Sequence, residues 1–362
     1  MKKIFSILLI ISFIMACNNH EENVKIRGFV DTVGFAHKAY QVDSVLSRID
    51  QLFGQKIAQI RDSLGITDTT TWKVAISPHD DHAYASYLYP LLLQNIKAKK
   101  LIIFGVAHKA WKLGLRDSLV FGTFDYWKGA LGKIKISPLR QEIINNLPKD
   151  DYIINDTMMA IEHSIEAFLP FLQKFVGKDI EIIPILVPYM SFERMNEIAP
   201  HLAAAIEKVM KEHHLKWGKD IAIIISTDAV HYGDQDWGGK NFAYYGADSA
   251  GYKKAVEHEH EIISTITGTL TPEKIKQFTH YTVQDTNYME YKWTWCGRYS
   301  VPMGLLTAYY LAKDLNQTLH GTLLEYATSI DHPTLKVKDI GMGTTAPANI
   351  HHWVGYAAIG YK

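Results

Sequence analysis

Histidines follow three short apolar segments of this sequence, and their placement is the first sign of chemistry. The apolar segments are residues 73–77, 100–105 and 220–226, and the histidines after them are His79, His108 and His231. Neutral imidazole is the commonest protein ligand for transition metals, and it can also carry protons. Three segments that each end near a histidine predict one metal-binding pocket shared by their ends.

A cysteine is expected to complete this pocket. The sequence has two cysteines, Cys17 near its start and Cys296, and we expect Cys17 to serve as a lipid anchor, so no disulfide is expected within the chain. A thiolate is a strong ligand for iron, zinc or copper. Arg298, two residues later, can lower the pKa of the thiol or bind an anionic group of a substrate. The alternative for Cys296 is a buried structural cysteine, the usual fate of a free thiol.

Acidic residues follow the first of these histidines. Asp80, Asp81 and a second histidine, His82, come directly after His79. Such side chains can bind a cation themselves or orient a ligating histidine through hydrogen bonds, and the alternative is a solvated polar turn. Two residues at the start of a predicted helix are expected to support the same pocket, namely Glu162 and His163.

An aspartate and a histidine three residues apart form a candidate catalytic pair. Asp228 precedes His231, and a single turn would place both side chains on one side. A carboxylate that accepts a hydrogen bond from one ring nitrogen leaves the other nitrogen free as a base or a ligand. The spacing alone equally favours a helix cap beside a packed histidine. Tyr232, the next residue, is expected to contact a substrate.

The arrangement of apolar segments predicts a single α/β domain with a mainly parallel central sheet and helices on both faces. Predicted strands cover 73–77, 100–105, 179–187 and 220–226, and predicted helices cover 42–64, 84–98, 161–176 and 191–213. Ligands of such sheets bind beyond the carboxyl ends of the strands. Glycine and aromatic residues are frequent in 237–252 and 340–360, which suggests loops folded over this rim.

The start of the chain is expected to be a leader and a tether. Two lysines precede an apolar segment, 4–15, that is too short to span a bilayer and is typical of a secretory signal peptide. Residues 14–17 (IMAC) resemble a bacterial lipobox, in which cleavage leaves an acylated Cys17. The alternative is an ordinary signal peptide. We expect a bacterial cell-envelope lipoprotein, on the periplasmic or cell-surface face, with a signal peptide at 1–16, a tether at 17–30 and the domain at 31–362.

The composition limits the classes of partner. Lysine plus arginine and aspartate plus glutamate both number 38, so the formal net charge is zero and no nucleic-acid partner is expected. The 20 tyrosines and 8 tryptophans suit a pocket with aromatic walls, with Trp237 among the candidates. Besides the membrane that a lipid anchor reaches, we expect a small-molecule or peptide ligand. The oligomeric state is left open.

Five motifs in a fixed order resemble the Memo family, also known as AmmeMemoRadiSam system protein B. They are Pro78-His79, 105–108 (GVAH), 162–172 (EHSIEAFLPFL), 226–233 (STDAVHYG) and 296–298 (CGR). Each motif is weak alone, but five in order are specific. The sequence departs from the family at 80–82 (DDH), where the family has Ala-Gly-Tyr, and at 106–107 (VA), where it has Pro-Ser.

The resemblance implies a fold similar to the catalytic subunit of class III extradiol dioxygenases, which are non-haem iron enzymes. It also implies that His79, His108 and Cys296 are metal ligands and that Asp228 and His231 form the neighbouring catalytic pair. Two imidazoles and one anionic ligand leave open positions, as in non-haem iron sites, so we expect one divalent transition metal with Fe(II) favoured. Because a thiolate is softer than a carboxylate, copper or zinc is the alternative.

Three functions remain open at this point. The first is a metal-dependent, oxygenase-like redox protein. The second is a zinc hydrolase in which the metal lowers the pKa of a bound water and Asp80, Asp81 or Asp228 acts as the base. The third is a pocket that binds a peptide or a small aromatic ligand without chemistry, because a fold does not determine a function.

Overall fold

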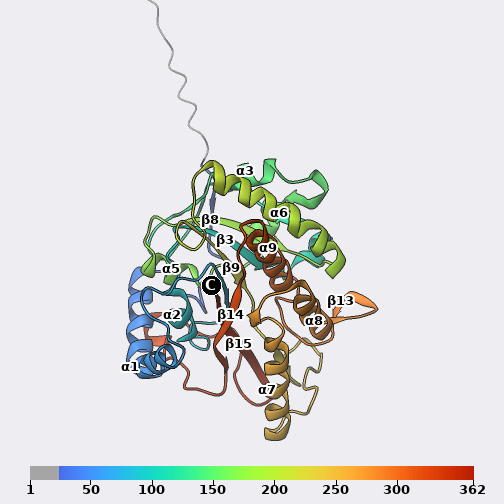
Figure 1. Cartoon of the computed structure of the whole chain (residues 1–362). Helices are drawn as coiled ribbons and strands as arrows, with labels where there is room; N and C mark the ends of the chain where they lie inside the picture. Colours follow the sequence, from blue (N-terminus) through green and yellow to red (C-terminus); the bar gives the residue numbers. More distant parts are fainter. Residues whose placement is uncertain (1–23) are drawn as a thin grey trace, which may run out of the picture.

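The structure is a computed structural model that describes residues 24–362 (Figure 1). The expected signal peptide, the expected lipidation site Cys17 and the first part of the expected tether lie outside these residues. Among the helices of the described part, none has both the length and the apolar character needed to cross a membrane.

One continuous sheet organises the described chain. From one edge to the other its strands are β1 (Ile26–Arg27), β5 (Tyr126–Trp127), β6 (Ile134–Ile136), β8 (Glu181–Val187), β3 (Lys100–Val106), β9 (Ile221–Ser226), β2 (Val74–Ser77), β15 (His352–Tyr361), β14 (His320–Thr328) and β11 (Gly268–Thr269). The strands from β6 to β2 pair in parallel. Four of them, β8, β3, β9 and β2, are the predicted strands, and their isoleucine-rich sequences suit strands buried on both faces.

Helices cover both faces of this sheet. Successive residues of a strand point to opposite sides, so a strand can contact helices on both faces. On β3, Ile102 and Phe104 pack against one set of helices, whereas Leu101 and Ile103 pack against the other. The first set is α3 (Leu139–Asn145), α6 (Phe192–Glu212), α7 (Ser249–Ser264), α8 (Pro272–Thr282) and α9 (Ser300–Asp314). The second set is α1 (Ala39–Ser63), α2 (Leu88–Leu93), α4 (Asp156–Ile161) and α5 (Leu169–Phe175). The predicted α/β class is confirmed (Figure 1).

The C-terminal part of the sheet is antiparallel, and one prediction fails there. The sequence predicts a loop over 340–360, but the second half of this segment is β15, a buried strand between β2 and β14. Its glycines serve close packing, because a Cβ on Gly360 would lie 2.4 Å from the ring of Trp72. A high glycine and aromatic content therefore does not identify a loop here.

Two predicted helices are shorter than expected. The predicted helix 161–176 is reduced to α5, because the Glu162 carboxylate accepts hydrogen bonds from the backbone N–H groups of His163 and Ser164, both at 2.9 Å. These bonds hold the segment between α4 and α5 as a turn. The predicted helix 84–98 retains only α2. The turn brings Glu162 and His163 to the end of β3, next to His108.

The N-terminal segment is tied into the fold by a buried arginine. The guanidinium of Arg27 donates to the carboxylate of Glu166 and to the carbonyls of Met159 and Glu162, and it lies 4.0 Å from the ring centre of Trp127. The last residues of the expected tether, 17–30, are thus part of the folded domain.

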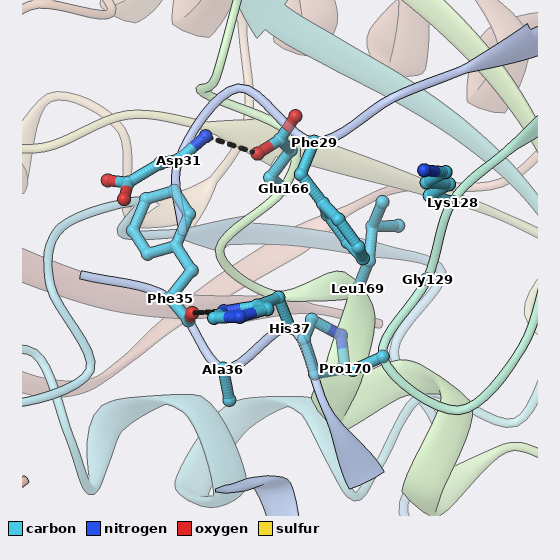
Figure 2. Close-up of a pocket in the computed structure, with 11 residues that line it drawn as sticks. Phe29, Asp31, Phe35, Ala36, His37, Lys128, Gly129, Glu166, Leu169 and Pro170 are labelled. Atoms are coloured by element: carbon cyan, nitrogen blue, oxygen red, sulfur yellow. Dashed lines mark hydrogen bonds between the residues drawn. The ribbon is translucent and has the colours of Figure 1, made fainter. Parts of the chain in front are cut away.

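The Glu166 carboxylate also holds the loop that follows β1. It accepts hydrogen bonds from the backbone N–H groups of Val30 and Asp31, at 2.9 and 3.0 Å. Figure 2 shows the Asp31 bond beside a small cavity of about 10 Å³ that Phe29 and Phe35 help to line. This cavity has room for little more than one water molecule, so the structure around Glu166 is closed.

The remaining elements connect or extend the sheet. They are β4 (Leu119–Phe121), β7 (Tyr152–Ile154), β10 (His231–Gly233), β12 (Val283–Gln284), β13 (Asn287–Tyr291) and the 3-10 helices η1 (Ala110–Leu113), η2 (Lys149–Asp151) and η3 (Lys338–Ile340). β10 pairs antiparallel with β15. The β12–β13 hairpin forms a separate small sheet that projects from the domain in Figure 1.

Candidate metal centre

The end of β2 presents His79 in a defined tautomer. Pro78, which lacks an N–H group, ends the strand before it. The His79 Nδ1 atom lies 2.8 Å from the hydroxyl of Ser226 at the end of β9. Because that hydroxyl donates its own hydrogen to the Ser164 carbonyl, it accepts the hydrogen of Nδ1. The His79 Nε2 atom therefore keeps its lone pair, as a metal ligand requires.

His108 follows β3 and is oriented in the same way. Its Nδ1 atom lies 2.9 Å from a carboxylate oxygen of Glu162, and its backbone N–H donates to the other oxygen at 2.8 Å. The Nε2 atom is again left free. Gly105 lies within β3, where a Cβ would be 2.8 Å from side-chain atoms of Ile165 and Leu186.

Cys296 reaches the same place from the loop before α9. Its sulfur accepts a hydrogen bond from the Asp228 backbone N–H at 3.0 Å and lies 3.5 Å from the His79 Nε2 atom. The loop passes so close to β9 that a Cβ on Gly297 would be 2.2 Å from the Thr227 hydroxyl. Glycine at this position therefore lets the sulfur approach the imidazoles.

These three side chains form one donor cluster. Ligand atoms of His79, His108 and Cys296 all lie within 4.8 Å of one another. The ring of His163 stacks on His108 with a centroid distance of 4.9 Å. Two overlapping groups satisfy the same distance limit, and they consist of His108, Glu162 and His163, and of Asp228, His231 and Cys296. The structure thus brings together most of the side chains that the sequence assigns to one site.

Asp228 and His231, the predicted catalytic pair, lie in one group of donors, but their contact differs from the expected one. The Asp228 carboxylate accepts a hydrogen bond from the His79 backbone N–H at 2.8 Å, and one of its oxygens lies 3.4 Å from the His79 Nε2 atom. Asp228 does not hydrogen-bond to His231. The His231 Nε2 atom is buried and has no hydrogen-bond partner within the described residues. An unpaired buried nitrogen of this kind is available to a substrate, a water or an ion.

A cavity of about 230 Å³ lies beside these side chains. Asp80 and Asp81 contribute to its wall, together with His163. Trp237 and Thr345 also line it, so parts of both predicted rim loops do reach the site. The Asp81 carboxylate accepts a hydrogen bond from the Thr345 N–H at 2.6 Å and thereby holds the second loop in place.

Burial keeps three imidazoles of the cavity neutral, those of His79, His163 and His231. It lowers the pKa of His163 to about 4 and that of His231 to about 3, and the proximity of His108 lowers both further. Burial also places the pKa of His79 well below its usual range. Conversely, burial and the nearby Asp228 carboxylate raise the pKa of the Cys296 thiol. A metal bound here would find free imidazole lone pairs and would displace the thiol proton.

The carboxylates of the site fall into two kinds. Burial raises the pKa of Asp80, Asp81 and Asp228 to about 7. Burial also opposes the ionisation of Glu162, but the adjacent His108 outweighs it, and the pKa of Glu162 falls to about 2. Glu162 is therefore a charged acceptor that orients His108.

His82 and Tyr232, both predicted as site residues, belong neither to the donor cluster nor to the lining of the cavity. His82 is buried beneath it, where Nε2 donates to the Ala167 carbonyl at 2.7 Å and Nδ1 accepts from the Ala36 N–H at 3.1 Å. Tyr232 is also buried, and its hydroxyl donates to the Gly246 carbonyl at 3.1 Å. Both side chains have their polar atoms occupied by the protein itself.

A buried glutamate supports the site without having been predicted. Glu259 of α7 accepts hydrogen bonds from the indoles of Trp293 and Trp295, at 2.6 and 2.7 Å, and from the Val230 N–H at 3.1 Å. Val230 and Trp295 also form a β-bridge with each other. The residues that follow them in the chain are His231 and Cys296. The charged sequence of α7 (SAGYKKAVEHEHEIIS) is typical of a surface helix, so it does not indicate that this side chain faces inward.

His352 is a second residue that sequence interpretation missed. It lines the cavity, and its ring stacks on Trp237 at 3.8 Å. Its Nε2 atom, like that of His231, is buried without a hydrogen-bond partner in the part of the chain that the structure describes. The two adjacent histidines at 351 and 352 were the available signal.

The donor set fits a transition-metal ion on chemical grounds. Two imidazole nitrogens keep their lone pairs because Ser226 and Glu162 accept hydrogen bonds from the opposite nitrogens. A thiol of Cys296 lies within reach of both, and mixed imidazole and thiolate donors suit iron, copper or zinc. The adjoining cavity leaves room for further ligands.

The fold and the site define an α/β protein with a His/His/Cys cluster at the carboxyl ends of parallel strands. Residues 44–345 match the family model of the Memo-like protein, and the chain belongs to this family. MEMO1 family proteins of Saccharolobus islandicus and Pyrococcus furiosus are 32% identical over 163 residues and 28% identical over 166 residues. These alignments cover 43% and 44% of this chain and 52% of each relative. The chain thus spans about half the length of the curated relatives that it matches.

Proposed function

We propose that this protein is a metal-dependent redox protein of the oxygenase-like kind, with Fe(II) as the favoured metal and copper as the alternative. The observation that carries this proposal is the convergence of His79, His108 and Cys296 beside a cavity of about 230 Å³. An iron or copper ion held by two imidazoles and a thiolate has open positions and can exchange electrons with a bound molecule.

The surrounding residues have separable roles in this proposal. Ser226 and Glu162 keep the two imidazoles in the tautomer that can bind a metal. His231, whose pKa burial lowers to about 3, is neutral and can accept a proton from a molecule in the cavity at its free Nε2 atom. Trp237 and His352 form an aromatic wall for that molecule.

Elemental analysis tests the proposal. We expect protein purified anaerobically and without a histidine tag to contain about one equivalent of iron or copper. The double variant His79→Ala/Cys296→Ala should lose it, whereas a double variant of two exposed histidines, His213→Ala/His280→Ala, should keep it. A folded wild-type protein without affinity for either metal would refute the proposal.

A zinc hydrolase is a second candidate, and a specific feature favours it. Asp80, Asp81 and Asp228 line the cavity beside the histidines, so carboxylates stand where a general base for a bound water would be needed. Purified protein that holds zinc and cleaves an ester, amide or phosphate substrate, with the activity lost in Asp228→Asn, would favour this candidate over the redox protein. Binding of a peptide or aromatic ligand without turnover would favour a third role, recognition alone.

We also propose attachment to a bacterial cell envelope through an acylated Cys17, on the strength of the lipobox-like sequence 14–17. The test is fractionation of cells that express the full chain. The wild-type protein should be found with membranes and carry acyl groups by mass spectrometry, and Cys17→Ser should be released. A wild-type protein that is recovered without acyl groups would contradict the anchor.

A further inference from the structure

A second cavity borders the same metal-binding residues. It measures about 60 Å³, and Cys296 and His108 form part of its wall. The other polar side chains that line it are Arg298, Tyr189, Tyr291 and Tyr299. A cavity of this size has room for a few water molecules or one small anion. Its chemistry differs from that of the larger cavity, because it contains a guanidinium and phenols in place of carboxylates.

The guanidinium of Arg298 is buried without an opposite charge. The side chain is 5% exposed, and its Nη2 atom donates a hydrogen bond to the Met289 carbonyl at 3.1 Å. Its Nε atom is buried and has no hydrogen-bond partner among residues 24–362. No carboxylate in this part of the chain forms an ion pair with it, although a guanidinium is always charged and burial of an unpaired charge is unfavourable.

The aromatic rings around Arg298 do not supply the missing charge. Its guanidinium lies 3.5 Å from the ring centre of Tyr291 and 4.7 Å from that of Tyr299. Such cation–π contacts hold the guanidinium plane in position. Burial raises the pKa of both phenols, so they are neutral near pH 7. The positive charge is thus oriented by its surroundings but not compensated by them.

We propose that the small cavity binds a carboxylate group, held by Arg298 next to the metal-binding residues Cys296 and His108. The planar fork of a guanidinium matches a carboxylate through two parallel hydrogen bonds. An anion in this cavity would be paired with the buried charge and would lie against the wall that the cysteine and histidine form. This inference rests on the proposed function in one respect, the metal next to the cavity. It adds to that function a substrate or co-substrate that carries a carboxylate.

Side-chain NMR of the full, metal-free protein can test this directly. Formate is titrated at constant ionic strength into ¹⁵N-arginine-labelled protein, and the Nε–H resonances are followed. We expect one arginine resonance to shift saturably, and the same resonance to be absent in Arg298→Lys, which assigns it. In Arg298→Gln the affinity for formate, measured by calorimetric titration, should fall about tenfold or more, the loss of a charge-assisted hydrogen bond. Inorganic phosphate should not displace formate, because it is larger and the cavity measures only about 60 Å³.

The matched control is Arg140→Gln. Arg140 is a half-buried arginine whose Nε atom also has no partner within the described residues, but it lies outside both cavities. This variant should lose its own resonance and keep the formate response. A wild-type protein in which no arginine resonance responds saturably overturns the inference, even if Arg298→Gln does not fold. Phosphate that displaces formate would refute the choice of a carboxylate.

Metal content measured on the same samples separates the two proposals. Arg298→Gln should hold as much metal as the wild type, because its side chain is not a ligand. Metal binding without any formate response would overturn only the carboxylate site. A formate response in a protein that binds no metal would overturn only the proposed redox function.

Discussion

Two buried arginines of this chain have opposite surroundings. Arg27 in β1 and Arg298 before α9 are 1% and 5% exposed, and each lies over an aromatic ring, at 4.0 Å from Trp127 and 3.5 Å from Tyr291. Arg27 is paired with the buried carboxylate of Glu166. Arg298 has no such partner within the described chain and borders a cavity instead.

The difference shows that a buried arginine side chain can serve two purposes. A buried charge requires an opposite charge, and for Arg27 the protein supplies it. This pair closes the N-terminal segment onto the turn that contains Glu162, whose carbonyl also accepts a hydrogen bond from Arg27. For Arg298 the structure leaves the place of the opposite charge open. The first arginine therefore stabilises the fold, and the second is suited to recognise a molecule from outside.

Unfolding measurements give the largest expected contrast. We expect Arg27→Gln to lower the free energy of unfolding by about 3 to 5 kcal/mol, because it leaves Glu166 buried and unpaired. Arg298→Gln should change this free energy by less than about 1.5 kcal/mol, because no carboxylate loses its partner. Urea unfolding of the metal-free proteins, followed by circular dichroism, measures both.

The double variant Arg27→Gln/Glu166→Gln is the control for this contrast. It removes both charges and should recover part of the stability that Arg27→Gln loses. Equal losses for Arg27→Gln and Arg298→Gln would mean that Arg298 is paired after all, and the distinction between the two regions would not hold.

A smaller effect is expected where the Arg27 region meets the metal centre. Glu162→Gln removes the negative charge that orients His108, and such a change lowers metal affinity by about 10- to 100-fold. Competition with a chromophoric chelator measures the affinity. The formate response of Arg298 should be unchanged, because Glu162 does not line the small cavity. The control is Glu181→Gln. It removes a carboxylate at the first residue of β8, the end of that strand away from the candidate metal centre.

The control Glu181→Gln should bind metal as tightly as the wild type. If Glu162→Gln does so too, the Glu162–His108 hydrogen bond does not orient a ligand. If Glu162→Gln also abolishes the formate response, the two cavities are not separable.

Local patterns predicted the central strands and the clustering of His79 and His108 for the same reason. Each strand is a short apolar run, and His79 and His108 follow their strands within a few residues. The carboxyl ends of parallel strands meet at one edge of a sheet, so convergence follows from topology. β15 was missed because its pairing with β2 and β14 depends on distant segments, which its glycines and aromatic residues do not reveal.

The supporting residues were missed because their partners are remote in sequence. Arg27 and Glu166 are separated by 139 positions, and Glu259 and Val230 by 29. The neighbouring sequence does not distinguish Arg27, Glu166 or Glu259 from exposed charged residues. His82 shows the opposite error. Its place next to two aspartates indicates a ligand, but its side chain is directed into the layer below, where Ala36 and Ala167 occupy both nitrogens.

His82 is a third buried basic side chain, and it tolerates burial by remaining neutral. Burial lowers its pKa to about 4 from the usual 6.5. Between these two values the unfolded chain holds a proton that the folded chain does not. The stability that neutral His82 contributes is therefore complete above about pH 6.5 and is lost as the pH falls toward 4.

The substitution His82→Gln is expected to have the smallest effect near pH 7, a loss of about 1 kcal/mol in unfolding free energy, because glutamine can replace only one of two hydrogen bonds. Toward about pH 4 the wild type should lose about 3 kcal/mol relative to the variant, so the order of stability reverses. Urea unfolding across this range measures the difference, and the exposed His320→Gln should show no such trend. Metal content should equal that of the wild type, since a variant that loses its metal would make His82 a ligand and place it in the cavity after all.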